Sequence, residues 1–223
     1  MNFFRQAALI CWKDLRLELR SRDAVYAALA FALVILLLFS FAFDPSEVET
    51  RQLAGGLLWI VFAFAAMLIL TRTFARELPN DCLDALLAAP LSPAALFTGK
   101  ALASFALVLA IELISLPVFG VFYNIGWTAQ FWPLAAVLAL ATWGLAVIGT
   151  AFSALTVNIR LRELMLPLLV YPLMIPALLA AMLLTAGLLT GQPAGAAWWR
   201  LLVAFDIIFT ALTAALIESI LVA

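Results

Sequence analysis

The stretch RTFARELPNDCLDALLAAPLSPAALFTGK, residues 72–100, is a polar insert between two long apolar runs. It holds three of the twelve basic residues of the chain and three of its thirteen acidic residues. The rest is far less polar, since 67% of the 223 residues are hydrophobic and only 11% are charged. A chain of this length cannot bury so much apolar surface in one soluble core. The composition therefore predicts an all-α polytopic membrane protein.

Six apolar runs are long enough to cross about 30 Å of hydrocarbon at about 1.5 Å per residue. With a cytoplasmic N-terminus, ten of the twelve basic residues fall on the cytoplasmic side, and only Arg51 and Arg200 fall outside. Because Lys and Arg concentrate on the cytoplasmic side of membrane proteins, this distribution predicts cytoplasmic N- and C-termini. The predicted spans, within a single domain of residues 1–223, are 24–43, 53–70, 101–122, 131–157, 164–189 and 201–223.

An amphipathic helix is predicted before the first span, within residues 1–23. Three apolar residues recur at i, i+3 and i+7, and three basic residues repeat this spacing one position later. The pattern is typical of a helix that lies on the inner leaflet. Two interpretations stay open: a generic basic anchor, and a dedicated elbow that moves the first span. The apolar residues are Trp12, Leu15 and Leu19, and the basic residues are Lys13, Arg16 and Arg20.

A short helix is predicted inside the insert, bracketed by Pro79 and Pro90. Helices of this length are marginal alone in water, so its leucine stripe needs a surface to lie against. Residues 77–89 contain three acids and no base, which favours a protein groove over anionic lipid. The alternative is a solvated loop with one incidental turn. The leucines are Leu83, Leu86 and Leu87, and the acids are Glu77, Asp81 and Asp84.

Several kinds of active site are excluded by the residues that the chain lacks. Gly99 and Lys100 are adjacent, but Ala94 replaces the first glycine of a P-loop, and Ala101 replaces its Ser or Thr. The absence of histidine excludes imidazole-ligated metals and Ser-His or Cys-His nucleophiles. A net charge of −1 argues against a nucleic-acid partner. We expect no enzyme activity, no metal and no cofactor bound by this chain alone.

Two acidic residues, Glu112 and Asp206, lie inside predicted spans. Ionisable groups within a membrane are costly, so both are candidates for a functional role. The structural alternative is that they are neutral or paired, for instance Asp206 with Arg200. The sequence leaves open whether they stabilise the bundle or contact a cargo or partner.

The fifth predicted span carries three prolines, Pro167, Pro172 and Pro176. Each proline removes a helix hydrogen bond, so the helix is expected to bend or break. A hinge that changes shape during a transport cycle and a static kink are both compatible with this pattern.

Two runs resemble a known family: LAGGLLWIVFAFAAMLILTRTFARELPNDCLDALLAAPLSP, residues 53–93, and PLLVYPLMIPALL, residues 167–179. With the elbow helix and six spans, they are similar to the CcmB family of ABC-2-type transporter permeases, the haem-exporter subunits of cytochrome c maturation. The resemblance covers essentially the whole chain. It implies a multi-pass protein of the bacterial inner (cytoplasmic) membrane.

The resemblance also implies partners. A separate ATPase subunit, CcmA, would dock on the insert, and CcmC, CcmD and the haem chaperone CcmE would act beside it, with haem as cargo of the complex and lipids around it. ATP hydrolysis would drive haem export or release of the haem-loaded chaperone. Cys82 stands where the family commonly has glycine. The expected ATPase-docking residues are Phe74, Glu77, Asp81, Leu83, Asp84 and Leu87 by this match, with Leu86 from the leucine stripe.

Two alternatives remain beside this interpretation. An ABC-2 permease with another cargo, such as a lipid-linked glycan or a drug, would share the six spans and the insert. A scaffold that carries no substrate and only transmits the ATPase stroke would explain why no polar pathway is evident in the spans.

Overall fold

The computed structural model describes residues 2–42, 48–78, 82, 86, 88–192 and 194–222. In this part of the chain every regular element is helical and no strand occurs. Six of the helices are long and apolar enough to cross a membrane. The prediction of an all-α, six-span protein is therefore confirmed.

The elements follow the order that the sequence predicts, and each predicted span corresponds to one long helix. The ends of two predicted spans, residues 43 and 223, lie outside the described residues, and the predicted span 131–157 runs one residue past the helix that ends at Thr156. The main correction concerns α5, which begins at Pro93 rather than residue 101. The Ser92 hydroxyl accepts a hydrogen bond from the Ala95 N–H at 3.1 Å, and this cap starts the helix early enough to include Lys100. The elements are α1 (Phe3–Ser21), α2 (Asp23–Ala42), α3 (Val48–Leu70), η1 (Ala75–Glu77), α5 (Pro93–Phe122), η3 (Thr128–Gln130), α6 (Phe131–Thr156), α7 (Arg162–Thr190) and α8 (Ala196–Val222).

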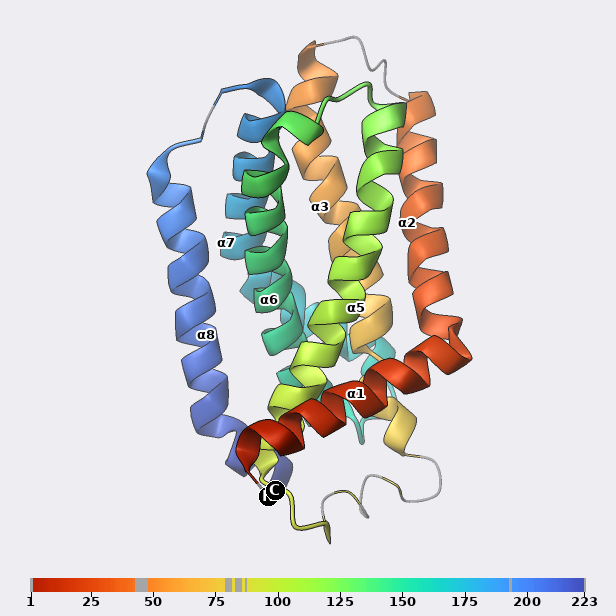
Figure 1. Cartoon of the computed structure of the whole chain (residues 1–223), viewed down its shortest axis with the longest axis vertical. Helices are drawn as coiled ribbons and strands as arrows, with labels where there is room; N and C mark the ends of the chain where they lie inside the picture. The colour runs from red at the N-terminus through yellow and green to blue at the C-terminus, as the bar shows by residue number, and fades with distance from the viewer. Residues whose placement is uncertain are drawn as a thin grey trace.

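The six long helices run alternately up and down, and α1 lies across one end of them (Figure 1). Arg22 adopts a left-handed conformation with φ of 61°, which ends α1 and turns the chain into α2. Both termini lie at the end of the bundle that α1 covers, which we call the α1 end (Figure 1). The amphipathic N-terminal helix is thus present, and it lies across the α1 end of the spans.

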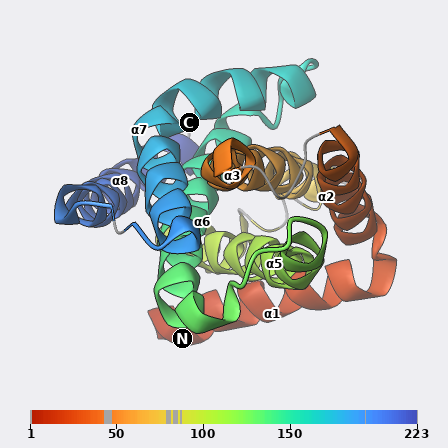
Figure 2. The ribbon, with the colours of Figure 1, turned by 90° about the horizontal axis from the view of Figure 1, so that it is seen from above.

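The centre of the bundle is α6, which packs against α5, α7 and α8 (Figure 2). Leu138, Ala141 and Leu145 of α6 are fully buried. A buried hydrogen bond of 2.9 Å from the Trp59 indole N–H to the Thr185 hydroxyl joins α3 to α7. An indole N–H at membrane depth needs such an acceptor, because no water is present to serve.

The proline-rich helix α7 is continuous from Arg162 to Thr190 and includes Pro167, Pro172 and Pro176. Viewed from above, its first half runs across the bundle before the helix changes direction (Figure 2). The prolines therefore accompany a bend and not a break. Their role as a hinge stays a prediction.

Candidate functional site

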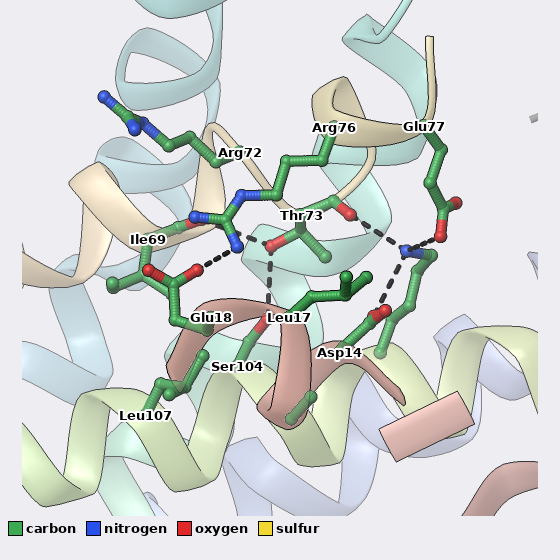
Figure 3. A pocket seen from close by; sticks show the side chains of 12 residues that line it. Asp14, Leu17, Glu18, Ile69, Arg72, Thr73, Arg76, Glu77, Ser104 and Leu107 are labelled. Atoms are coloured by element: carbon green, nitrogen blue, oxygen red, sulfur yellow. Dashed lines mark hydrogen bonds and ion pairs between the residues drawn. The ribbon is translucent and has the colours of Figure 1, made fainter. Parts of the chain in front are cut away.

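Charged and polar side chains from three elements meet at the α1 end of the bundle (Figure 3). They surround a cavity of about 70 Å³ beneath α1. We call this cluster the basal junction. Its members are Lys13, Asp14 and Glu18 of α1, Thr73, Arg76 and Glu77 at the start of the insert, and Lys100 and Ser104 of α5.

Lys100 is the centre of the basal junction and is 1% exposed. Its Nζ donates to the Thr73 carbonyl at 2.9 Å and to Asp14 Oδ2 at 3.2 Å. It also lies 3.0 Å from Glu77 Oε1 and 4.8 Å from the centroid of the Phe74 ring. A buried ammonium is tolerated only with such a set of acceptors, so one side chain joins all three elements.

Lys13 adds a second cation beside the same carboxylates. Its Nζ donates to Glu77 Oε1 and lies 3.0 Å from Asp14 Oδ1. Burial alone would lower the pKa of Lys13, but the Asp14 and Glu77 carboxylates outweigh it, so this pKa is raised. With Arg76 and Glu18, the basal junction holds three cations and three anions and is electrically balanced.

Arg76 and Glu18 form the second ion pair of the basal junction, and Figure 3 shows the two side chains pointing toward each other. Glu18 is 2% exposed, and its Oε1 also accepts the Val25 N–H of α2 at 3.2 Å. The Thr73 and Ser104 hydroxyls lie 3.1 Å apart and link the insert to α5. The start of the insert is therefore fixed to α1, and through α1 to α2.

Gln6 of α1 binds the other end of the insert. Its side-chain amide donates to the Pro90 carbonyl at 3.3 Å and accepts the Ser92 N–H at 3.4 Å. Gln6 reaches these atoms because α1 and α5 pack closely at Gly99. A Cβ added at Gly99 of α5 would lie only 2.7 Å from the Ala7 carbonyl oxygen of α1. The helix α1 thus holds the insert at both ends, between residues 76–77 and residues 90–92.

The expected ATPase-docking residues separate into two groups. Phe74 is 1% exposed and Glu77 is 8% exposed, and both side chains make the contacts of the basal junction. Within this chain they anchor the insert, so they are not a free docking surface. Cys82 and Leu86 are helical, with Leu86 half-buried and Cys82 exposed. Asp81, Leu83, Asp84 and Leu87 lie outside the described residues.

The elbow helix differs from the prediction at Lys13, which was assigned to a basic side facing lipid. Trp12 and Leu19 are indeed exposed, as are Arg16 and Arg20, so a lipid-facing surface exists. Lys13 instead turns to the basal junction, because a second, more polar face of α1 packs on the bundle beside it. This face carries Gln6, Ile10, Asp14 and Glu18.

Sequence reasoning missed Gln6, Asp14, Glu18 and Lys100 as functional candidates. A signal was present, because Gln6, Ile10, Asp14 and Glu18 follow one another at i, i+4 spacing and so share one side of a helix. A row that mixes an amide and two acids is unsuited to an anionic leaflet. It indicates contact with protein.

Glu112 of α5 is 1% exposed and is paired with α6. The Thr142 hydroxyl lies 2.7 Å from each of its carboxyl oxygens. This contact joins two spans at a depth where no water serves as donor. Glu112 therefore has a packing role in the bundle, and the structure leaves a further role untested.

Asp206 of α8 is 6% exposed, and neither carboxyl oxygen has a hydrogen-bond partner among the described residues. It faces Gly144 of α6, where an added Cβ would lie 2.9 Å from Asp206 Oδ1. The expected pairing with Arg200 is wrong, since Arg200 is exposed and bonds no acid in the described part of the chain. Asp206 stays an intramembrane polar candidate.

No group of three or more Cys, Asp or Glu residues that could hold a metal ion is found in residues 2–42, 48–78, 82, 86, 88–192 and 194–222. The basal junction itself is filled by its own cations. Its arrangement fits mechanical connection between elements.

Comparison with known proteins decides the family. A family model described as CcmB protein matches residues 5–221. The chain belongs to the CcmB family. Heme exporter protein B of Rhodobacter capsulatus is 35% identical over 156 residues, which are 70% of this chain and 71% of the relative. The protein of the same name from Paracoccus denitrificans is 37% identical over 157 residues, with the same coverage. That of Escherichia coli K12 is 29% identical over 99 residues, 43% of this chain and 45% of the relative.

The match places the basal junction in the context of a CcmB-family membrane protein. The matched residues 5–221 include all six long helices, the insert and nearly all of α1. The resemblance that the two quoted runs indicate is thereby confirmed, and the chain is a multi-pass membrane protein of this family.

Proposed function

We propose that this protein is the membrane permease subunit of a haem exporter that serves cytochrome c maturation. Membership of the CcmB family carries the proposal, together with two relatives, each named heme exporter protein B, that align with about 70% of the chain. The subunit lies in the cytoplasmic membrane of a bacterium, with both termini in the cytoplasm. Ten basic residues on the α1 side support this orientation.

A separate ATPase, CcmA, supplies the energy in this proposal, because the chain has no P-loop. It docks on residues 79–89, between the two ends of the insert that α1 holds. Movement of the docked ATPase pulls on Gln6 at one end and on the basal junction at the other. The movement is then transmitted to α1, α2 and α5 together, because Glu18 links α1 to α2 and Lys100 links α5 to α1. CcmC, CcmD and the haem chaperone CcmE complete the complex.

Complementation tests the haem assignment. The chain is expressed in a Rhodobacter capsulatus strain that lacks its own heme exporter protein B, and covalently haem-stained c-type cytochromes are measured. We expect yield to recover. If the protein is present in the membrane at normal level together with its own partner subunits and cytochromes stay absent, the haem assignment is wrong, and a permease for another cargo becomes the better explanation.

Co-purification tests the docking site separately. Changing Leu83 and Leu87 to Asp adds two acids to the leucine stripe and is expected to abolish recovery of the ATPase with the tagged protein. The matched control is Ile159→Asp/Leu161→Asp, which adds the same two charges at exposed apolar residues of the α6–α7 connection at the same end of the bundle. Unchanged ATPase recovery with the leucine variant would contradict docking at this segment.

A further inference from the structure

A cavity of about 610 Å³ opens beside the basal junction at the α1 end, and nothing in the proposed function uses it. Residues of α2, α3, η1 and α7 line it, and α3 packs against both α2 and α7. Its deep walls belong to membrane-spanning helices, whereas its mouth includes the turn after α3 and the start of α7. It therefore extends from bilayer depth to the interface.

The deep part of the cavity is apolar and aromatic. Phe31 of α2, Phe64 of α3 and Tyr171 of α7 form a row, with ring centroids 6.3 Å apart for the first two and 5.3 Å apart for the second two. Phe64 is 50% exposed although it lies within a span. The Tyr171 hydroxyl is buried and has no hydrogen-bond partner among the described residues. This surface fits acyl chains.

The mouth of the cavity is positively charged. Arg72 and Arg162 line it, and neither forms an ion pair in the described part of the chain. Figure 3 shows Arg72 pointing away from the basal junction. Arg76 also lines the mouth but is neutralised by Glu18. Glu163 is the one further charged residue lining the cavity, so two unpaired cations face one unpaired anion.

We propose that this cavity binds an acidic glycerophospholipid from the leaflet at the α1 end. Its acyl chains lie along Phe31, Phe64 and Tyr171, and its phosphate is held by the guanidinium groups of Arg72 and Arg162. Basic pockets between helices at the interface hold anionic head groups by this combination of charge and hydrogen bonds.

Charge favours this occupant over a protein one. A second copy of the chain or an apolar partner helix would cover the aromatic row but would leave two arginines facing apolar surface, which is costly. A phospholipid matches both parts of the cavity. Its acyl chains lie at the depth of the aromatic row, and its phosphate lies at the mouth, where the arginines are. The net positive mouth further selects an acidic head group over a zwitterionic one.

Native mass spectrometry of the purified full-length protein in detergent tests this proposal. Equimolar phosphatidylglycerol and phosphatidylcholine with identical acyl chains are added, and the bound lipid is identified. We expect phosphatidylglycerol to be retained over phosphatidylcholine by about thirtyfold, because two arginines near the surface contribute about 1 kcal/mol each. The variant Arg72→Gln/Arg162→Gln should lose this selectivity, and each single variant should be intermediate. The charge-matched control Arg160→Gln/Arg200→Gln should keep it.

A steric variant tests the acyl-chain part. Ala27 lines the cavity and is exposed, so Ala27→Trp fills it from α2 and should remove bound lipid of either kind. Ala30→Trp, also exposed on α2 but outside the cavity, should retain it. Equal selectivity in the Arg72/Arg162 double variant, or equal lipid retention in Ala27→Trp, would overturn the proposal. So would a wild-type protein that carries no lipid and has a second copy in its place.

Discussion

At the basal junction each charged side chain faces one of opposite sign, whereas Glu112 and Asp206 have no cation within ion-pairing distance among the described residues. The junction lies at the end of the bundle that α1 covers, and the two acids lie within spans. The difference teaches that the chain uses charge in two ways. At the α1 end, balanced charges connect elements that are far apart in sequence. Within the spans, Glu112 is bonded by one hydroxyl, and Asp206 has no hydrogen-bond partner among the described residues.

Loss of Lys100 gives the largest effect that this comparison predicts. Lys100→Met removes the buried cation that Asp14 and Glu77 share and leaves only the partly exposed Lys13 to pair with both carboxylates, so it should destabilise the protein by about 3 kcal/mol, the lower end for breaking a buried ion pair. Stability is measured as the melting temperature in detergent, monitored by the size-exclusion profile. Arg160→Met, which removes an exposed cation, is the control. Equal melting temperatures for both variants would mean that the junction is not a structural connection.

Arg76 and Glu18 are expected to show the next largest effect. A double-mutant cycle with Arg76→Gln, Glu18→Gln and the pair should give a coupling free energy of about 1–2 kcal/mol. The pair joins the insert to α1, so both single variants should also lower ATPase co-purification. Additive changes in stability would show that the two groups act independently, contrary to the contact seen in Figure 3.

Thr142→Val tests the paired acid of the spans. The substitution keeps the shape of the side chain but removes the hydroxyl that bonds Glu112, and it should cost about 1–2 kcal/mol of stability. The matched control is Thr150→Val on the same helix, whose buried hydroxyl has no partner and whose loss should not destabilise. Equal melting temperatures for the two valine variants would contradict a stabilising bond between Thr142 and Glu112.

Asp206→Leu tests the unpaired acid and should act in the opposite direction. Removing a buried polar group that has no partner is expected to raise stability by about 1 kcal/mol. Holocytochrome yield is measured in parallel. Higher stability with lower yield assigns Asp206 to cargo or partner contact, and higher stability with normal yield assigns it to packing. Lower stability would show that Asp206 has a stabilising partner.

The smallest effect concerns pH and Lys13. Because its pKa is raised in the folded protein, the stability that Lys13 contributes is complete below its ordinary value of 10.5 and is lost as pH rises through the higher folded value. Melting temperatures from pH 9 to 11.5 should therefore fall slightly more for wild type than for Lys13→Arg, which keeps its charge throughout. If the melting temperatures of the two proteins fall equally with pH, the charge of Lys13 does not contribute to the stability of the basal junction. Its 39% exposed side chain limits the size of the difference.

Apolar runs predict the spans of this chain well, because any helix that crosses the bilayer must be apolar over its whole length. The basal junction was harder to predict. Lys100 looks like an ordinary interfacial cation in sequence, and only the early start of α5 at Pro93 places it inside a helix beneath α1. Asp14 contacts Lys100, 86 residues away, and Glu18 contacts Arg76, 58 residues away, and the spacing within α1 does not identify these partners. Asp206 was recognised as unusual, but the pairing with Arg200, one of the alternatives left open, is not seen among the described residues, because Arg200 is exposed and Asp206 is buried.

The attachment of α1 to both ends of the insert has a consequence for the segment between them. Because residues 76–77 and 90–92 are held by the same helix, α1 sets the distance between the two ends of this segment, whatever sequence it has. The entropy cost of bringing those ends together is then met by contacts outside the segment. Under the proposed function, a replacement segment of equal length from another permease should therefore leave the bundle unchanged and alter which ATPase co-purifies.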